Sequence, residues 1–142
     1  MNTPDRSRSA EELMAVVSLL NRRMRAASTE GALTPSQRIA LSRLAEGPAT
    51  TAALARAEHV RPQSMRATVG VLEEAGLVER TPHPTDGRQV VFSLTAAGRD
   101  RLVALRQAKE TWLADAITAR LDGAEQRLLD QAIDLLKRLA QA

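Results

Sequence analysis

The apolar residues of this chain recur every three or four positions over most of its length, which is the spacing of amphipathic helices. The pattern predicts a helix at about residues 10–28 and a long helix that starts after Thr95 and ends near Leu121. Another helix follows toward the C-terminus, where Ile133 and Leu136 share its apolar face. Both ends of the chain are therefore expected to be helical.

Three shorter helices are expected between these long ones, because start and stop residues divide the intervening segment. The sequence Thr34-Pro35-Ser36-Gln37 is typical of a capping box, and Gly47-Pro48 should end the helix that it begins. Thr50 is the expected cap of the next helix, which is short. The third helix is expected to begin at Pro62, since proline is tolerated in a first turn, and to end at Gly76.

Beyond the third short helix the apolar period changes to that of a strand. Val90, Phe92 and Leu94 stand at every second position, so residues 89–94 are expected to form a half-buried strand. A strand at residues 77–81 would pair with it through the turn sequence PHPTDG. The expected fold class is mainly α, and three short helices followed by a two-stranded wing are typical of a winged helix-turn-helix.

The order of these elements divides the chain into three parts. We expect an N-terminal helix of a dimerisation lobe in residues 1–32, a winged helix-turn-helix domain in 33–96 and C-terminal dimerisation helices in 97–142. The terminal helices carry apolar stripes too wide for one short lobe to cover, which predicts a two-fold homodimer. The alternative is a monomer in which these helices fold over the winged domain.

Composition and charge remove several classes of function. The chain has no cysteine, which excludes disulfide frameworks and thiolate metal sites, and its two histidines lie in turns, so no metal or other cofactor is expected. No phosphate-binding glycine loop or nucleophile elbow is present, so an enzyme is not expected. No apolar run suits a membrane span or a secretory signal, and a cytoplasmic protein is expected. The net charge of +3 permits binding to nucleic acid without arguing for it.

The residues most suited to reading DNA lie at the start of the third short helix. The second helix of a helix-turn-helix enters the major groove with its first residues, and glutamine and arginine there can pair with adenine and guanine. The alternative is a solvated helix face, with Met65 and Val69 on the opposite, core side. Gly70 weakens this helix unless another backbone packs against it or the helix bends there. The expected DNA-contacting residues of this helix are Arg61, Gln63, Ser64, Arg66 and Thr68.

One arginine, Arg88, follows the Asp-Gly turn at the tip of the expected wing. It is either a solvent-exposed charge or a probe that enters the minor groove beside the recognition helix. Asp86 would shape the turn and hold the Arg88 guanidinium through a charge-assisted hydrogen bond. Arg80, at the base of the wing, would contact the DNA backbone or pair with Glu79.

Residues 33–98 resemble the MarR family of bacterial transcription regulators. The segments LEEAGLVER, DGR and SLTAAG occur in the order and spacing of that family. The resemblance implies a homodimer that binds double-stranded DNA and represses its targets until a small ligand intervenes. It also implies the DNA-binding roles of Asp86 and Arg88.

Family members often bind a small aromatic or phenolic anion, and the resemblance places such a ligand near Met24 and Trp112. The alternative, which helical spacing favours, is that Trp112 belongs to the core. The absence of cysteine excludes the variant of the family that senses peroxide through a thiol. A second class of function stays open, in which the winged helix binds another protein instead of a specific DNA sequence.

Overall fold

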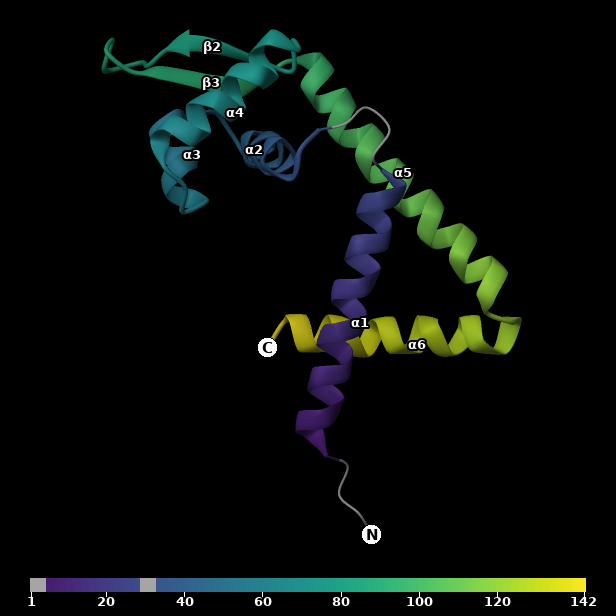
Figure 1. Ribbon diagram of the computed structural model, residues 1–142. Coiled ribbons are helices and arrows are strands. Elements are labelled where there is room, and N and C mark those ends of the chain that lie inside the picture. Colours follow the sequence, from purple (N-terminus) through teal and green to yellow (C-terminus); the bar gives the residue numbers. More distant parts are fainter. Residues whose placement is uncertain (1–4, 29–32) are drawn as a thin grey trace. The chain divides into compact units, whose positions relative to one another are not determined.

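The computed structural model describes residues 5–28 and 33–142, and the chain forms two units (Figure 1). One unit combines the N-terminal segment to Ser28 with Gln107–Ala142, and the other is the segment that lies between them and ends at Arg106. The boundary falls inside one long helix, α5 (Ala96–Arg120). The division of function between the three predicted parts of the chain stays a prediction.

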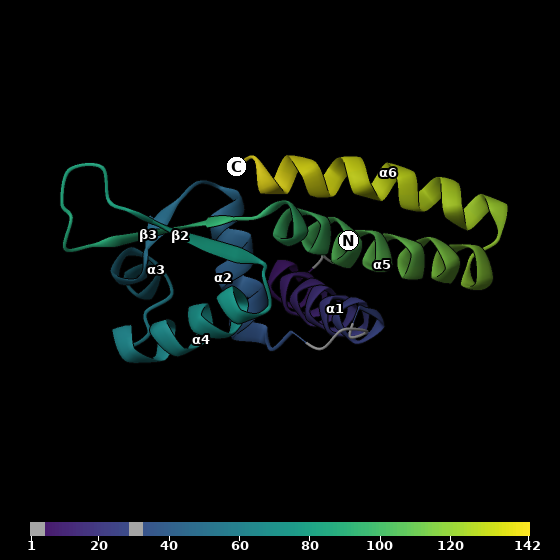
Figure 2. The same cartoon turned by 90° about the horizontal axis from the view of Figure 1, so that it is seen from above.

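The middle unit has the predicted winged helix-turn-helix architecture. Its elements in chain order are α2 (Pro35–Ala45), β1 (Ala49–Thr50), α3 (Thr51–Ala57), α4 (Pro62–Glu74), β2 (Val78–Pro82), β3 (Val90–Leu94) and the beginning of α5 (Ala96–Arg120). In Figure 2 the loop between β2 and β3 extends away from the helices of this unit as a wing. The mainly helical fold class is therefore confirmed.

The predicted helix ends of this unit are fixed by side-chain caps at two N-termini and by a glycine after one C-terminus. Thr34 Oγ1 accepts from the Gln37 N–H at 3.2 Å, and Gln37 Oε1 accepts from the Thr34 N–H at 3.0 Å, which completes the capping box. Thr50 Oγ1 accepts from the Ala53 N–H at 3.1 Å and so caps α3. Gly76 follows α4 with a φ of +76°, the left-handed conformation that glycine adopts most easily.

The sheet contains the predicted two-stranded wing and one strand that was not predicted. The strand order is β1-β3-β2, and all pairs are antiparallel. In the wing, Val78 lies opposite Leu94 and Pro82 opposite Val90. The additional strand β1 has two residues between Pro48 and the start of α3, which is too short to produce a recognisable period.

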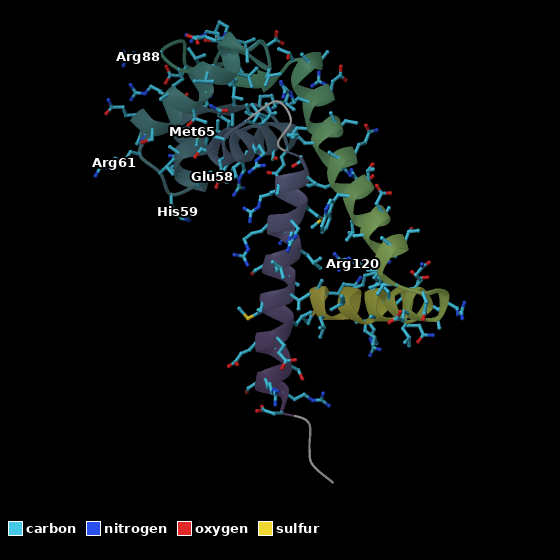
Figure 3. All side chains as sticks on the ribbon, turned by 45° about the vertical axis from the view of Figure 1, so that its right-hand side comes forward. Glu58, His59, Arg61, Met65, Arg88 and Arg120 are labelled. Atoms are coloured by element: carbon cyan, nitrogen blue, oxygen red, sulfur yellow. The ribbon has the colours of Figure 1, made fainter. Side chains whose placement is uncertain are left out.

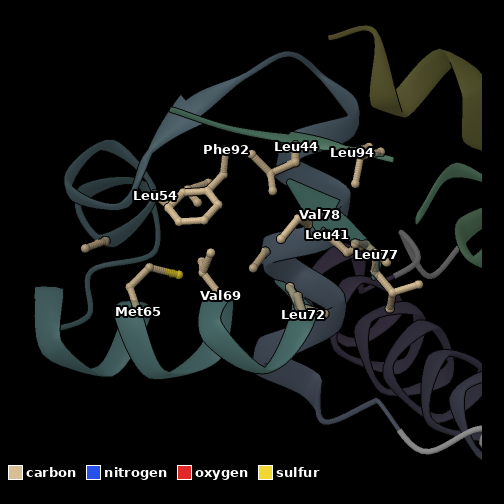
Figure 4. Packing of buried hydrophobic residues seen from close by; sticks show 12 residues of the cluster. Leu41, Leu44, Leu54, Met65, Val69, Leu72, Leu77, Val78, Phe92 and Leu94 are labelled. Carbon is tan, nitrogen blue, oxygen red and sulfur yellow. The ribbon is translucent and has the colours of Figure 1, made fainter. Parts of the chain in front are cut away.

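A single hydrophobic cluster holds the middle unit together (Figure 4). Leu41 of α2 and Val69 and Leu72 of α4 are fully buried, and Met65 is 4% exposed, as the helical period predicts. Phe92 and Leu94 of β3 close the cluster from the side of the sheet. Burial of each such large side chain contributes about 1.5–3 kcal/mol, so this face of α4 fixes the helix on the unit.

The other unit is built from α1 (Arg6–Ala27), the C-terminal part of α5 and α6 (Gly123–Ala140). Asp5 caps α1, and Asp122 forms a capping box with Glu125 at the start of α6. Within the described chain, neither α1 nor α6 contains a buried residue. Several of their large apolar side chains are exposed, among them Met14 (71%), Leu128 (63%) and Leu139 (64%). None of the described helices is long and apolar enough to cross a membrane.

Two helical glycines differ in the space around them, and this predicts opposite effects of alanine. A Cβ on Gly70 of α4 would meet nothing within 4 Å, so no backbone packs against it. A Cβ on Gly98 of α5 would lie 2.1 Å from the Leu77 carbonyl oxygen. We expect Gly70→Ala to raise the free energy of unfolding by about 1 kcal/mol, because alanine favours the helix. Gly98→Ala should lower it by about 1–3 kcal/mol or more, because the backbone must move.

Urea denaturation of the two variants beside the wild type, followed by circular dichroism, measures both effects. Each variant adds the same methyl group to a helix, so each is the control for the other. Effects of the same sign would contradict the prediction.

Candidate nucleic-acid interface

The N-terminal half of α4 presents polar side chains to solvent. Arg61 is the N-cap residue, with an extended backbone and no side-chain capping bond, because a guanidinium has no acceptor for the first N–H groups of the helix. Gln63 and Arg66 are also exposed. Figure 3 shows the Arg61 and Arg88 side chains extending outward from the winged unit, one from the start of α4 and one from the wing. Within the described chain, none of Arg61, Arg66 and Arg88 forms an ion pair.

Arg66 and Arg88 meet at one open groove between the wing and the starts of α3 and α4. The groove has a volume of about 380 Å³. No carboxylate is among its described lining residues, and two of them are cationic. It therefore attracts anions, and its position brings together an arginine of the helix and an arginine of the wing. The lining residues are Thr50, Thr51, Ala52, Pro62, Arg66, Arg88, Gln89 and Val90.

Ser64 and Thr68 lie on a different flank of α4 from Arg66. Both line a smaller, mainly apolar pocket of about 160 Å³ together with Ile39 and Val60. Residues four apart share a helix face, which explains why these two stay together and turn away from the groove. The Thr68 hydroxyl also donates to the Ser64 carbonyl at 3.1 Å. The sequence prediction grouped all five α4 residues, but the geometry separates them.

Asp86 shapes the wing loop as predicted, but it does so through the backbone. Its Oδ1 accepts from the Arg88 N–H at 3.0 Å, and its Oδ2 accepts from the Gln89 side-chain amide at 3.3 Å. The predicted hydrogen bond to the Arg88 guanidinium is not formed among the described residues. That part of the prediction was wrong. His83 also bonds within this loop, and sequence reasoning assigned it no role.

Arg80 joins the base of the wing to the end of α4. Its Nε and Nη2 donate to the two carboxylate oxygens of Glu73 at 2.6 and 2.7 Å, and its guanidinium lies 5.5 Å from the centre of the Phe92 ring. The pair with Glu73 takes the place of the predicted pair with Glu79, and a contact of Arg80 with the DNA backbone stays a prediction. The hydrogen bonds from Arg80 lower the pKa of Glu73, against a smaller opposing effect of desolvation.

The residues proposed for a ligand lie in the unit of α1 and α6, and the structure separates them. Met24 lines a pocket of about 250 Å³ together with Asn21, Arg25 and Lys109. Trp112 is half-buried on α5 and is not among the described residues that line this pocket. Over residues 5–28 and 33–142, no three His, Cys, Asp or Glu side chains come together to hold a metal ion.

The Glu73–Arg80 pair predicts a stability effect that disappears in acid. Because the pKa of Glu73 is lowered in the folded state, the stabilisation is present above the ordinary glutamate value of 4.5. It is lost as the pH falls through the lowered pKa. A double-mutant cycle of Glu73→Gln and Arg80→Gln should give a favourable coupling in urea unfolding at pH 7, and this coupling should become smaller as the pH is lowered below 4.5.

Glu74→Gln is the matched control for this cycle, since the neighbouring carboxylate has no recorded bond to Arg80. A Glu74–Arg80 coupling as large as the Glu73–Arg80 coupling would show that the cycle measures general electrostatic attraction and not the hydrogen-bonded pair. A Glu73–Arg80 coupling that does not decrease at any pH below 4.5 at which the protein stays folded would also contradict the assignment.

Comparison with known proteins places the whole chain among bacterial regulators. The family model described as MarR family matches residues 33–89. The HTH-type transcriptional regulator MT0903.1 of Mycobacterium tuberculosis is 40% identical over 134 residues, which are 94% of this chain and 93% of that protein. The HTH-type transcriptional repressor Rv2887 of M. tuberculosis is 33% identical over 126 residues, 87% and 89% of the two chains.

A solved structure extends the likeness to the fold. The crystal structure of RV1404 from M. tuberculosis has a TM-score of 0.76 and 26% identity, and the match covers 97% of this chain and 96% of that one. Both sequence relatives are named as transcriptional regulators, and neither is named as an enzyme. The predicted resemblance is confirmed: the chain belongs to the MarR family of winged helix-turn-helix transcriptional regulators.

Proposed function

We propose that this regulator binds a palindromic operator as a homodimer and represses transcription until a small ligand releases it. The observation that carries the DNA-binding part is the cationic groove between α4 and the wing, which Arg66 and Arg88 line without a carboxylate. Such a groove attracts the phosphates of DNA, and contacts with the base edges beside it supply the sequence specificity. The name of the relative Rv2887, a transcriptional repressor, supports repression as the outcome.

In this proposal α4 reads the major groove with the exposed side chains of its first turns. Arg61 and Gln63 reach base edges, since arginine suits guanine and glutamine suits adenine, at about 1–3 kcal/mol for each good pair. Arg66 binds on the wing side of the helix. Ser64 and Thr68, which share the other flank, contact the DNA there with short polar side chains.

The wing contributes Arg88 to the adjacent minor groove. Its guanidinium has no carboxylate partner among the described residues, so DNA binding breaks no existing ion pair. A narrow A·T-rich minor groove concentrates negative potential, which favours an inserted arginine. Asp86 acts indirectly, through the turn that carries Arg88.

The homodimer accounts for the exposed apolar faces of the terminal helices. Met14, Leu128 and Leu139 are each more than 60% exposed in the single chain. A second copy that packs on α1 and α6 would cover such side chains and remove their cost in water. Two-fold symmetry would place the two recognition helices about 34 Å apart, which is one turn of DNA.

Titration of a selected DNA site tests the roles of the two groove arginines. After selection from random duplexes, we expect a palindrome, and Arg66→Ala and Arg88→Ala should each weaken binding by at least about 1 kcal/mol. Arg88→Ala should also relax the preference for A·T pairs under the wing. Fluorescence anisotropy at two salt concentrations measures affinity and the number of released counterions.

Arg120→Ala is the control, because it removes the same charge from the end of α5, outside the groove. If Arg120→Ala weakened DNA binding as much as Arg88→Ala does, the effect of Arg88 would be explained by the change in net charge alone. If no DNA sequence is enriched and the groove variants bind like the wild type, the alternative prevails, and the winged helix serves a protein partner.

The ligand part of the proposal rests on the pocket beside Met24. Arg25 and Lys109 supply two positive charges to a pocket of about 250 Å³, a size suited to one aromatic ring with an acidic substituent. The pocket lies within one unit and holds Met24 but not Trp112, so Trp112 is assigned to packing on α5. Nothing in these contacts requires a metal or other cofactor.

Salicylate, which carries both a phenol and a carboxylate, is the probe for this pocket. We expect it to raise the Tm of the wild type and to raise it less in Lys109→Ala, because a ligand stabilises the state that it binds. Lys137→Ala, which removes a lysine of α6 outside the pocket, is the control. Equal shifts in all three proteins would contradict the site.

A further inference from the structure

His83 stands at the start of the wing loop, where the proposed function assigns it no role. The loop runs from the end of β2 at Pro82 to the start of β3 at Val90. Its two ends are joined by the backbone bond from the His83 N–H to the Gln89 carbonyl at 3.1 Å. The residues between these ends are not part of the strand ladder, so their conformation depends on other contacts.

The imidazole of His83 supplies those contacts inside the first half of the loop. Its Nδ1 accepts from the backbone N–H groups of Thr85 at 3.2 Å and Asp86 at 3.1 Å. The Thr85 hydroxyl lies 3.3 Å from the same nitrogen. An imidazole nitrogen can accept only when it carries no proton, so this geometry assigns the ring proton to Nε2.

Asp86 continues the same arrangement in the second half of the loop. While its N–H is held by His83, its Oδ1 accepts from the Arg88 N–H at 3.0 Å and its carbonyl accepts from the Gln89 N–H at 3.0 Å. The loop therefore contains two side-chain acceptors in succession, His83 Nδ1 and Asp86 Oδ1. The second of them binds the backbone N–H of Arg88. Among residues 5–28 and 33–142, the Arg88 side chain forms no hydrogen bond or ion pair that would fix its direction.

We infer that His83 is a positioning residue for DNA binding, which orders the wing loop through Nδ1 and thereby presents Arg88 to the minor groove. The inference rests on the proposed role of Arg88. Without the Nδ1 acceptor, the Thr85 and Asp86 amides turn to water and the loop samples more conformations. DNA binding must then order the loop, and the conformational entropy lost in doing so lowers the affinity.

Replacement of His83 by asparagine or glutamine tests whether the position of the hydrogen-bond acceptor matters independently of the imidazole ring. The Oδ1 of asparagine is as many bonds from the backbone as Nδ1, and asparagine accepts from the second following N–H in many turns. The oxygen of glutamine is one bond farther out. We expect His83→Ala and His83→Gln to weaken DNA binding by about 3- to 10-fold, and His83→Asn to bind like the wild type.

The same substitutions in an Arg88→Ala background test whether His83 acts through Arg88. We expect His83→Ala to cause no further loss there, because the loop then has no arginine to present. A full further loss would overturn the inference, since His83 would be touching DNA itself. Unchanged urea midpoints for all variants would exclude a general loss of folding as the cause.

Amide hydrogen exchange of the free protein tests the loop without DNA. The Thr85, Asp86 and Arg88 amides should exchange faster in His83→Ala and at the wild-type rate in His83→Asn. Unchanged rates in His83→Ala would overturn the inference even if DNA binding is confirmed. Faster exchange combined with normal DNA binding by Arg88→Ala would instead show that the loop is ordered as inferred and that the proposed role of Arg88 is wrong.

Discussion

Burial of one face of α4 is the interaction on which the candidate DNA interface depends. Met65, Val69 and Leu72 share that face and pack against α2 and the sheet, with at most 4% of each side chain exposed. A helix held by such a stripe cannot rotate without exposing it, so its other faces are fixed as well. The directions of Gln63 and Arg66, which the proposed function assigns to DNA recognition, are therefore set by apolar residues on the opposite side of the helix.

The wing is tied to this same helix at two levels. In the core, Phe92 and Leu94 of β3 join the cluster that holds α4, and β3 pairs with a strand on each side. At the surface, Arg80 of β2 forms its two hydrogen bonds with Glu73 in the last turn of α4. The surface pair alone would be a weak restraint in water. Together with the buried strand β3, it fixes the base of the wing relative to α4.

The sequence was most informative where a structural feature depends on neighbouring residues. The Thr34 capping box, the Thr50 cap, the Gly76 stop and the buried stripe of α4 are all local, and all were predictable from spacing and residue type. The residues of the candidate site could also be placed on α4 and the wing. Their grouping could not, because it depends on which flank of α4 faces the wing, and that is fixed by packing.

The features that sequence reasoning missed depend on contacts across elements or on a single atom. Strand β1 exists because Ala49 and Thr50 lie beside β3, and two residues show no period of their own. Arg80 selects Glu73, seven residues earlier, in place of the adjacent Glu79 because successive strand residues point to opposite faces. Histidine offers a ring nitrogen in any turn, but only the folded loop brings two N–H groups to it.

The distribution of charge explains how a nearly balanced protein can present a cationic groove. The acids of the winged unit could cancel the field of its arginines, yet several are already engaged: Glu58 pairs with Arg43 and Glu73 with Arg80.

The Asp86 carboxylate bonds two uncharged groups of its own loop, the Arg88 N–H and the Gln89 side-chain amide, and forms no ion pair in the described chain. Arg61, Arg66 and Arg88 have no carboxylate partner in the described chain. Because screening in salt confines each charge to about 8–10 Å, what matters at the groove is this local sorting and not the net charge of +3. The Glu73–Arg80 pair thus neutralises one carboxylate of α4, and the described lining of the groove contains none.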